Sequence, residues 1–302
     1  MTTNSDLFVD VELLKVVQVG RVLTVTIDCP PINLFDIKLL TEFDRVSTWA
    51  AGEPTVGAVI LNSAVPDFWI AHFDVNLILR FPTDRAPAHE LGLFTRVCEQ
   101  FRSMPKLTIA VIDGRVGGGG SELAMSFDVR YVTDRAVFNQ PEVALGILPG
   151  GGGTQRLPRL IGRSRAMEVI LGCEDIDAAT AEQWGWVNRR YPNLADAQQA
   201  ADALAARSST FPPHAVAEAK ASVLRAEGHD LPADLLEEIR AFARTLGHDR
   251  AKLAMRSFIE IGGQTPAGEH DLARTALRAA SLEDSPDSQR PSDRSGSSTH
   301  RR

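Results

Sequence analysis

Residues 113–157 read DGRVGGGGSELAMSFDVRYVTDRAVFNQPEVALGILPGGGGTQRL, and the rest of the chain is best interpreted from this stretch. It holds two glycine runs, Gly117–Gly120 and Gly150–Gly153, and each run precedes a segment of helix-like composition. Two glutamates, Glu122 and Glu142, each stand beside one of these turns. Glycine-rich turns that lead into helices can present backbone N–H groups to an anion, and paired carboxylates often perform acid–base chemistry. The stretch therefore predicts a functional site.

The composition is that of an ordinary globular protein. Of 302 residues, 44% are hydrophobic and 24% are charged, which is enough for one large domain or two small ones. The net charge of −7 disfavours a nucleic-acid partner, because phosphate binding needs a basic surface. An anionic small molecule is still compatible with this charge, since a local nest of N–H groups can bind one.

Three cysteines, Cys29, Cys98 and Cys173, are widely spaced and form no CxxC pattern. This predicts reduced thiols in the cytoplasm rather than a disulfide framework or a zinc site. The histidines lack metal spacing such as HExxH, so we expect no metal. The N-terminal sequence MTTNSDLFVDVELLK lacks the apolar segment of a secretory signal. No uncharged apolar run reaches about 18 residues, so we also expect no membrane span.

Residue patterning predicts an α/β sheet in the first half of the chain. Residues 16–28 indicate a β-hairpin, and residues 36–51 carry apolar side chains at three- and four-residue spacing, as in an amphipathic helix. Residues 56–61 and 107–112 are short apolar runs typical of strands buried on both faces. Such alternation of strands and helices is the pattern of an α/β fold. Further helices are expected at 91–104 and 122–127, and further strands at 129–133 and 136–139.

From Gly153 onward the pattern becomes almost wholly helical, with one short strand expected at 187–191. The composition shifts at Ser281 to Ser, Asp, Pro and Arg with few apolar side chains, which predicts a disordered tail. The expected helices are 154–161, 163–171, 178–184, 194–208, 213–226, 232–245, 248–261 and 268–282. The predicted parts are an N-terminal extension (1–15), an α/β core (16–205), a helical C-terminal region (206–282) and the tail (283–302).

Three motifs in this order carry a family resemblance: GGGSELAMSFD, QPEVALGILPGGGGTQRL, and AMEVIL followed by GWVN. They resemble the enoyl-CoA hydratase/isomerase (crotonase) superfamily, and the similarity extends more weakly from about Val16 to about Ile261. The resemblance implies a crotonase-like ββα spiral with a helical C-terminal trimerisation region, and a homotrimer or dimer of trimers. It also implies an acyl-CoA substrate in fatty acid metabolism. Coenzyme A is then part of the substrate, and no separate cofactor is expected.

Members of this superfamily stabilise an enolate with two backbone N–H groups, and by motif position these belong to Phe73 and Gly119. The residues support Gly119 independently, because it precedes SELAM, where a helix begins with unpaired N–H groups and a positive dipole end. The alternative is that these glycines only permit a tight turn.

The resemblance implies that Glu122 activates water and that Glu142 exchanges the proton at Cα, as in a hydratase. Hydration needs both functions, and burial would raise a carboxyl pKa toward the neutral range. The backbone of Gly150 is expected to help hold the water. The alternatives are that Glu122 is a first-turn acid favoured by the helix dipole, and that Glu142 is an ordinary loop carboxylate.

The sequence departs from the family pattern at Ala71-His72-Phe73-Asp74, where the family commonly has Ala-Gly-x-Asp. We interpret His72, which replaces glycine, as a structural or channel-lining residue; the alternative is a further acid–base group. The remaining residues expected to line the substrate path are Ala71, Asp74, Val75 and Asn76.

The predicted function is hydration of a trans-2-enoyl-CoA to a 3-hydroxyacyl-CoA. Two alternatives remain: another activity of the superfamily on a CoA thioester, such as double-bond isomerisation or C–C hydrolysis or cleavage, and a non-catalytic acyl-CoA binder. Other chemistries have weaker support. Ser121 is not in a GxSxG elbow, and neither glycine run continues into the Lys-Ser/Thr of a P-loop.

Overall fold

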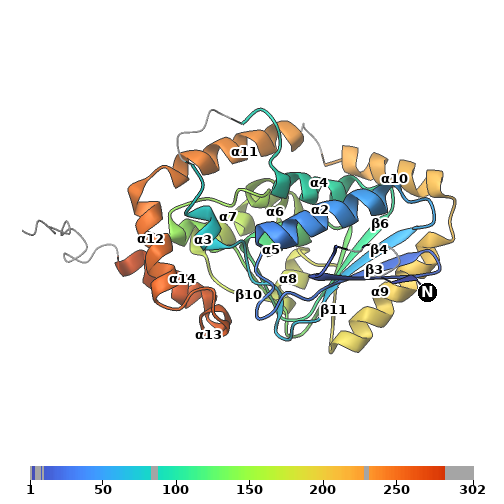
Figure 1. The fold of residues 1–302 in the computed structure, drawn as a ribbon, viewed down its shortest axis with the longest axis horizontal. Coiled ribbons are helices and arrows are strands. Elements are labelled where there is room, and N and C mark those ends of the chain that lie inside the picture. The colour runs from blue at the N-terminus through green and yellow to red at the C-terminus, as the bar shows by residue number, and fades with distance from the viewer. Residues whose placement is uncertain (1, 4–7, 9, 83–87, 228–230, 283–302) are drawn as a thin grey trace, which may run out of the picture.

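Two β-sheets form the centre of the molecule (Figure 1). The computed structural model describes residues 2–3, 8, 10–82, 88–227 and 231–282. In the larger sheet seven strands lie in the order β1-β2-β3-β4-β6-β8-β11. The pairs β1–β2 and β2–β3 are antiparallel, and all later pairs are parallel. These strands are β1 (Thr2–Thr3), β2 (Leu14–Val19), β3 (Val22–Ile27), β4 (Ala58–Ser63), β6 (Leu107–Ile112), β8 (Val129–Thr133) and β11 (Arg189–Tyr191).

The smaller sheet has four strands in the order β10-β9-β7-β5. Its members β5, β7 and β9 run parallel, and β10 is antiparallel to β9. The strands are β5 (Phe68–Ile70), β7 (Arg115–Gly117), β9 (Val137–Asn139) and β10 (Ile176–Asp177).

The chain alternates between the two sheets in a repeated unit. A strand of the larger sheet is followed by a strand of the smaller sheet and then by a short helix, three times in succession. The strand pairs are β4 with β5, β6 with β7, and β8 with β9. These helices are α3 (Val75–Ile78), α5 (Gly118–Ala124) and the 3₁₀ helix η1 (Glu142–Leu145). The repeat confirms the predicted ββα spiral. Because β5, β7 and β9 are parallel neighbours, the segments that follow them emerge at one edge of the smaller sheet, as ligand-binding loops do in parallel sheets.

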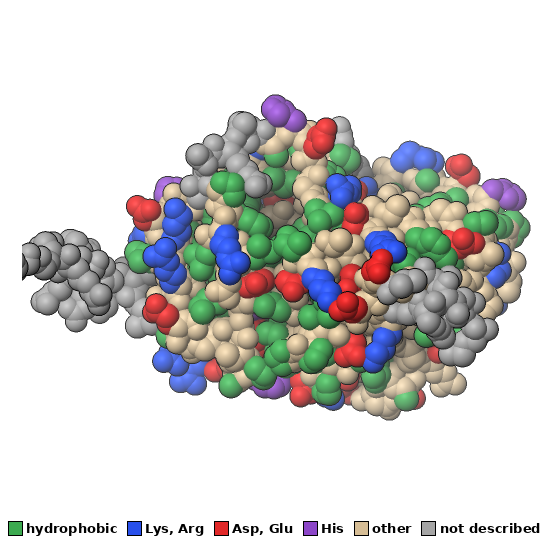
Figure 2. Space-filling view, in the orientation of Figure 1, with side chains coloured by type: hydrophobic (Ala, Val, Ile, Leu, Met, Phe, Trp, Pro, Cys, Tyr) green, Lys and Arg blue, Asp and Glu red, His purple; other side chains and the backbone are tan. Residues whose placement is uncertain are grey.

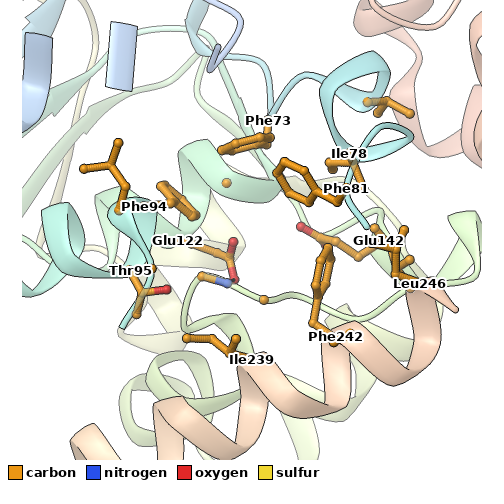
Figure 3. A pocket seen from close by; sticks show the side chains of 18 of the residues that line it. Phe73, Ile78, Phe81, Phe94, Thr95, Glu122, Glu142, Ile239, Phe242 and Leu246 are labelled. Atoms are coloured by element: carbon orange, nitrogen blue, oxygen red, sulfur yellow. Dashed lines mark hydrogen bonds between the residues drawn. The ribbon is translucent and has the colours of Figure 1, made fainter. Parts of the chain in front are cut away.

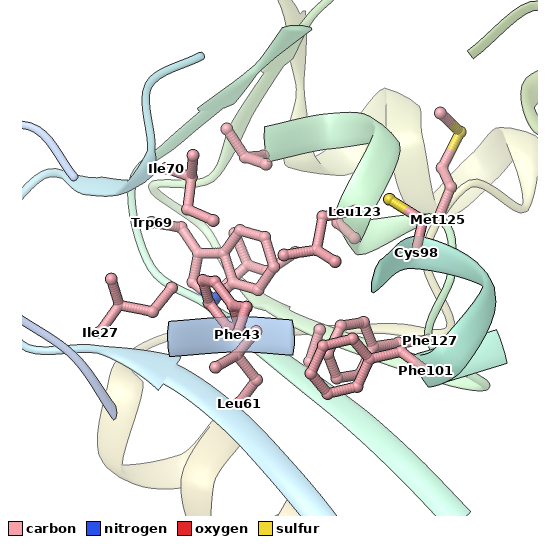
Figure 4. Close-up of a cluster of buried hydrophobic side chains, with 14 of the residues drawn as sticks. Ile27, Phe43, Leu61, Trp69, Ile70, Cys98, Phe101, Leu123, Met125 and Phe127 are labelled. Atoms are coloured by element: carbon pink, nitrogen blue, oxygen red, sulfur yellow. The ribbon is translucent and has the colours of Figure 1, made fainter. Parts of the chain in front are cut away.

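Helices cover both faces of the larger sheet, which explains why β4 and β6 are apolar throughout. α2 (Ile37–Gly52) and α4 (Leu93–Ser103) pack together over one face, with the aromatic cluster of Figure 4 in the core beneath them. α9 (Leu194–Ser209) covers the opposite face. Its buried alanines stand four residues apart, on one side of the helix, and let it approach the strands closely. They are Ala197, Ala201 and Ala205.

The C-terminal helices form a second apolar cluster against α3 and η1. Figure 1 shows α12, α13 and α14 together at one end of the molecule, with α11 crossing above. Their bounds are α11 (Leu231–Leu246), α12 (Asp249–Glu260), α13 (Pro266–His270) and α14 (Leu272–Leu282). The remaining helices are α6 (Gly153–Ile161), α7 (Arg163–Gly172), α8 (Ala178–Trp184) and α10 (Pro213–Arg225).

Three details differ from the sequence predictions. The single helix expected at 268–282 is wrong, because Asp271 leaves the helical region (φ −127°, ψ 48°) and separates α13 from α14. The helix expected from Glu122 begins earlier, at Gly118, inside the glycine run. Strands β1, β5, β7 and β10 were not predicted, since two or three residues carry little readable alternation, whereas the equally short β9 and β11 lie within the strands expected at 136–139 and 187–191. The predicted tail, 283–302, and much of residues 1–9 lie outside the described residues.

Lys, Arg, Asp and Glu side chains are interspersed on the face shown in Figure 2. Opposite charges therefore neutralise one another locally, and this face has no extended positive field of the kind that a phosphate backbone attracts. Among the helices that the structure describes, none is both long and apolar enough to cross a bilayer.

Candidate active site

A cavity of about 730 Å³ lies where α3, α5 and η1 meet α4, α11 and α12. Aromatic and aliphatic side chains form most of its wall (Figure 3). Two carboxyl groups, those of Glu122 and Glu142, face into this largely apolar space. Apolar cavities with a few convergent polar groups are typical of small-molecule sites. The aromatic side chains are Phe73, Phe81, Phe94, Phe242 and Phe258.

Glu122 is buried, with 3% of its surface exposed. Its Oε1 accepts hydrogen bonds from the N–H groups of Gly151 and Gly153, both at 2.8 Å. Burial raises the pKa of the Glu122 carboxyl above its ordinary value, while these two N–H groups and the charge of Arg156 oppose part of the rise. The carboxylate form is thus held in one orientation at the start of α6, where the helix dipole also favours negative charge.

Glu142 has a different environment, although it faces the same cavity. It begins η1, is 9% exposed, and its Oε2 has no hydrogen-bond partner among the described residues. Burial and then the charge of Glu122 raise the pKa of Glu142 well above its ordinary value. Its own backbone N–H opposes part of this rise. Burial with few donors favours the neutral form of a carboxyl, so this form is favoured more strongly at Glu142 than at Glu122.

Phe73 and Gly119, the two predicted N–H donors, both line the cavity. Gly119 is the second residue of α5, so its N–H has no acceptor within the helix. Phe35 donates its N–H to the carbonyl of His72 (2.9 Å) and accepts from the N–H of Asp74 (3.0 Å). The intervening N–H of Phe73 therefore points away from Phe35. A Cβ built on Gly119 would lie 3.5 Å from the Phe73 nitrogen, which places the two donors side by side.

The other predicted substrate-path residues divide into two groups. Val75 and Gly150 line the cavity. Ala71, Asp74 and Asn76 lie outside its lining: Ala71 donates its N–H to Ile32 and is buried, while Asp74 caps α3 by accepting from the N–H of Asn76 at 2.9 Å. A substrate contact for these three residues stays a prediction.

Two further residues support the Glu122 loop and were not predicted. Arg156 is 4% exposed and donates to the carbonyl of Gly151 (2.7 Å) and to Glu99 (2.6 Å). Glu238 of α11 accepts from the N–H of Thr154 (2.8 Å) and from its hydroxyl. Arg156 lies within a quoted motif and could have been noticed there. The helix that carries Glu238 has only an ordinary amphipathic pattern, and nothing local marks this glutamate.

The geometry and the similarity to known proteins agree. The family model for enoyl-CoA hydratase/isomerase matches residues 18–265. The chain belongs to the enoyl-CoA hydratase/isomerase family. The short-chain-enoyl-CoA hydratase of Clostridium acetobutylicum is 33% identical over 243 residues, which cover 80% of this chain and 92% of that protein. The mitochondrial enoyl-CoA hydratase of Pongo abelii is 32% identical over 225 residues, covering 74% of this chain and 75% of the relative.

Solved structures place the fold in the same family. A crystal structure from Streptomyces avermitilis has a TM-score of 0.81 and 33% identity, covering 89% of this chain and 99% of its own. The enoyl-CoA hydratase from Mycobacterium avium subsp. paratuberculosis has a TM-score of 0.72 and 25% identity, with coverage of 83% and 97%. The family match at residues 18–265 includes the spiral core and helices α10, α11 and α12, and it ends just before α13.

Proposed function

We propose that this protein hydrates trans-2-enoyl-CoA thioesters reversibly to 3-hydroxyacyl-CoA. The observation that carries the proposal is the pair of buried carboxyls, Glu122 and Glu142, facing one apolar cavity whose wall also contains Phe73 and Gly119. Family membership supports the same activity. The match to the Clostridium acetobutylicum hydratase spans 92% of that relative's length, so nearly the whole relative is represented in this chain.

In this mechanism the thioester oxygen accepts hydrogen bonds from the N–H groups of Phe73 and Gly119. Negative charge grows on that oxygen as the enolate forms, so donors fixed in advance stabilise the transition state more than the ground state. Loss of one such donor typically lowers the rate by about 100- to 1,000-fold. The apolar wall strengthens these bonds because it excludes water from around them.

The two carboxyls divide the proton transfers. The Glu122 carboxylate, held by its two N–H donors, takes a proton from water as the oxygen bonds to the β-carbon. The neutral carboxyl of Glu142 gives its proton to the α-carbon, which breaks the carbon–carbon double bond. Atoms and charge balance, and the pair then regains its first state by passing the proton from Glu122 back to Glu142. Two carboxyls whose surroundings give them different pKa values are typical of acid–base pairs in enzymes.

The test is the absorbance of the conjugated thioester, with crotonyl-CoA and longer enoyl-CoAs as substrates. We expect wild-type protein to remove this absorbance, and Glu122→Gln and Glu142→Gln each to lower kcat by about 100- to 10,000-fold, the usual contribution of a general acid or base. Glu168→Gln is the matched control, because Glu168 is exposed on α7. Wild-type rates in both active-site variants would show that the mechanism is wrong.

Double-bond isomerisation, a second activity of the family, remains an alternative because a single acid suffices to move a proton. Glu142 is such an acid, and its Oε2 has no hydrogen-bond partner among the described residues. Double-bond isomerisation leaves the product mass unchanged, whereas hydration adds one water, so product mass spectrometry separates them. A non-catalytic acyl-CoA binder would be stabilised thermally by coenzyme A without any turnover.

We further propose a homotrimer or dimer of trimers that acts in fatty acid metabolism in the cytoplasm, without a separate cofactor. The family relationship supports the assembly, and light scattering in solution measures its mass. The free thiols of Cys29, Cys98 and Cys173 suit a reducing compartment.

A further inference from the structure

A buried ion pair connects the Phe73 loop to the C-terminal helices. His72 is 4% exposed and Glu269, on α13, is 1% exposed. The Nε2 of His72 lies 2.9 Å from Oε1 of Glu269. His72 stands where the family pattern has glycine, so this contact is a feature of the present chain rather than of the motif.

Both ring nitrogens of His72 face acceptors. Nδ1 lies 2.8 Å from the carbonyl oxygen of Phe73, and a carbonyl can only accept a hydrogen bond. Nδ1 therefore carries a proton, and Nε2 donates to the Glu269 carboxylate. Burial lowers the pKa of His72, but the charge and hydrogen bond of Glu269 raise it above its ordinary value. Burial raises the pKa of Glu269, yet His72 lowers it overall. The two shifts favour the imidazolium form of His72 and the carboxylate form of Glu269.

The two peptides that flank the Cα of Phe73 are both held. The peptide that contains the Phe73 N–H is fixed at its carbonyl, that of His72, which accepts from the N–H of Phe35 at 2.9 Å. The carbonyl of the next peptide, that of Phe73, accepts from the His72 ring, which Glu269 holds in turn. The ion pair therefore restrains the loop on the C-terminal side of the Phe73 N–H, and Phe35 restrains it on the other.

Glu269, the partner of His72 in this pair, is also held by a second hydrogen bond. Glu269 accepts from the N–H of Gln264 at 2.7 Å. The Gln264 side chain in turn donates to Asp74 (2.8 Å) and accepts from the N–H of Val75 (3.1 Å). Gln264 and Glu269 together therefore contact the whole turn from residue 72 to residue 75, immediately after β5.

Stability alone does not explain this arrangement. A buried ion pair is often no more stabilising than apolar side chains of the same volume, because both charges lose their hydration. Oε2 of Glu269 has no hydrogen-bond partner among the described residues, which adds to the cost. Both nitrogens of His72 are already occupied, so the ring is also unsuited to exchange protons with a substrate. What the pair does provide is one defined orientation of the loop.

We propose that His72 and Glu269 are positioning residues, whose ion pair orients the Phe73 N–H toward the thioester oxygen and so makes the oxyanion site depend on docking of α13. This inference rests on the proposed acyl-thioester chemistry of the cavity. It adds two residues that act through the Phe73 backbone and do not touch the reacting atoms.

The experiment compares His72→Gln and Glu269→Gln with Lys220→Met. Lys220 forms a partly buried ion pair with Asp128 at 2.8 Å, on α10. Lys220→Met therefore controls for the general effect of breaking an ion pair. We expect the two loop variants to lower kcat by at least about tenfold, a fraction of the effect of losing a donor, with KM changed less than about threefold, since most of the CoA contacts remain. The control should keep wild-type kcat.

A spectroscopic measurement separates positioning from overall damage. Cinnamoyl-CoA is a conjugated thioester whose aryl group disfavours hydration, and its absorption shifts to longer wavelength when N–H donors polarise the carbonyl. We expect a red shift with wild-type protein and with Lys220→Met, and a reduced shift with either loop variant. If His72→Gln does not fold, Glu269→Gln alone decides, because it keeps the size of the side chain.

Full red shift and full kcat in Glu269→Gln would overturn the inference, as would the absence of any red shift with wild-type protein. Failure of the proposed function has a different signature. In that case wild-type protein would shift the absorption of cinnamoyl-CoA but would not hydrate any enoyl-CoA.

Discussion

Gly151 has no side chain, and this leaves the space that Glu122 and Phe94 occupy in the cavity wall. A Cβ there would lie 2.1 Å from Cε1 of Phe94 and 2.6 Å from Oε2 of Glu122. A Cβ does not pack this close to other heavy atoms, so Gly151 is the residue that lets the carboxylate, the aromatic wall and the N–H donor occupy the same corner. The need is for space rather than for unusual backbone angles, since the structure assigns Gly151 no positive φ.

Gly151→Ala should therefore displace Glu122 and lower kcat by about 100-fold, the scale expected when a reacting group moves by about 1 Å. Steady-state kinetics with crotonyl-CoA measures the effect. The control is Gly172→Ala in α7, where an added Cβ would meet nothing within 4 Å. That variant should keep wild-type kcat. Equal activities in the two variants would contradict the role assigned to Gly151.

At the scale of elements, carboxyl groups from two other helices accept hydrogen bonds at the N-terminal end of α6. Glu122 comes from α5 and binds Gly151 and Gly153, while Glu238 comes from α11 and binds Thr154. A helix N-terminus stabilises nearby negative charge. The two carboxyls also repel each other: burial and then the charge of Glu122 raise the pKa of Glu238 to about 8.

This shift predicts a pH dependence of stability. The folded protein keeps the Glu238 proton up to about pH 8, whereas the unfolded chain releases it near its ordinary value of 4.5. The folded state thus binds more protons between these values, and the free energy of unfolding falls as pH rises through them. Glu238→Gln should reduce this fall, so its Tm relative to wild type should be higher at about pH 8.5 than at about pH 5.

Thermal unfolding followed by circular dichroism across this range is the measurement. Glu237→Gln is the neighbouring control: Glu237 is exposed, and hydrogen bonds from Arg244 lower its pKa, so it titrates below this window. A wild-type pH slope in Glu238→Gln would show that Glu238 is ionised throughout this pH range.

At the scale of the whole molecule, the C-terminal helices complete a cavity that the spiral core leaves open. The core supplies the carboxyls and the N–H donors, while α11 and α12 supply part of the apolar wall. Phe258 of α12 is fully buried, lines the cavity and packs against the His72 ring, with centroids 5.8 Å apart. Folding of the C-terminal region and formation of the site are therefore coupled.

Phe258→Ala should lower the free energy of unfolding by about 3–5 kcal/mol, the usual cost of a cavity left by a buried aromatic ring. Chemical denaturation measures this. Phe211→Ala is the comparison, because Phe211 is 45% exposed and follows α9, and its replacement should cost less than about 1 kcal/mol. A similar loss in both variants would mean that the α12 cluster is not tightly packed.

The sequence predicted the elements with long, periodic patterns and missed several of the shortest strands. The apolar runs that became β4 and β6, and the amphipathic pattern of α2, were readable because burial on one or both faces repeats along the chain. β5, β7 and β10 have two or three residues each, and their existence depends on pairing with strands distant in sequence. The break at Asp271 likewise has no local signal strong enough to divide the helix.

For the site, the family resemblance predicted Glu122, Glu142, Gly119 and Phe73, and the structure places all four in the wall of one cavity. Their roles in catalysis stay predictions. Only the tertiary structure decided what surrounds them. Parallel pairing in the smaller sheet brings the three segments to one edge, and folding of the C-terminal helices adds Glu238 and Glu269. The physical reason is that motifs record local chemistry, whereas burial, pKa and the orientation of an N–H depend on residues that are distant in sequence, such as the partners 84 and 197 positions apart in the Thr154–Glu238 and His72–Glu269 contacts.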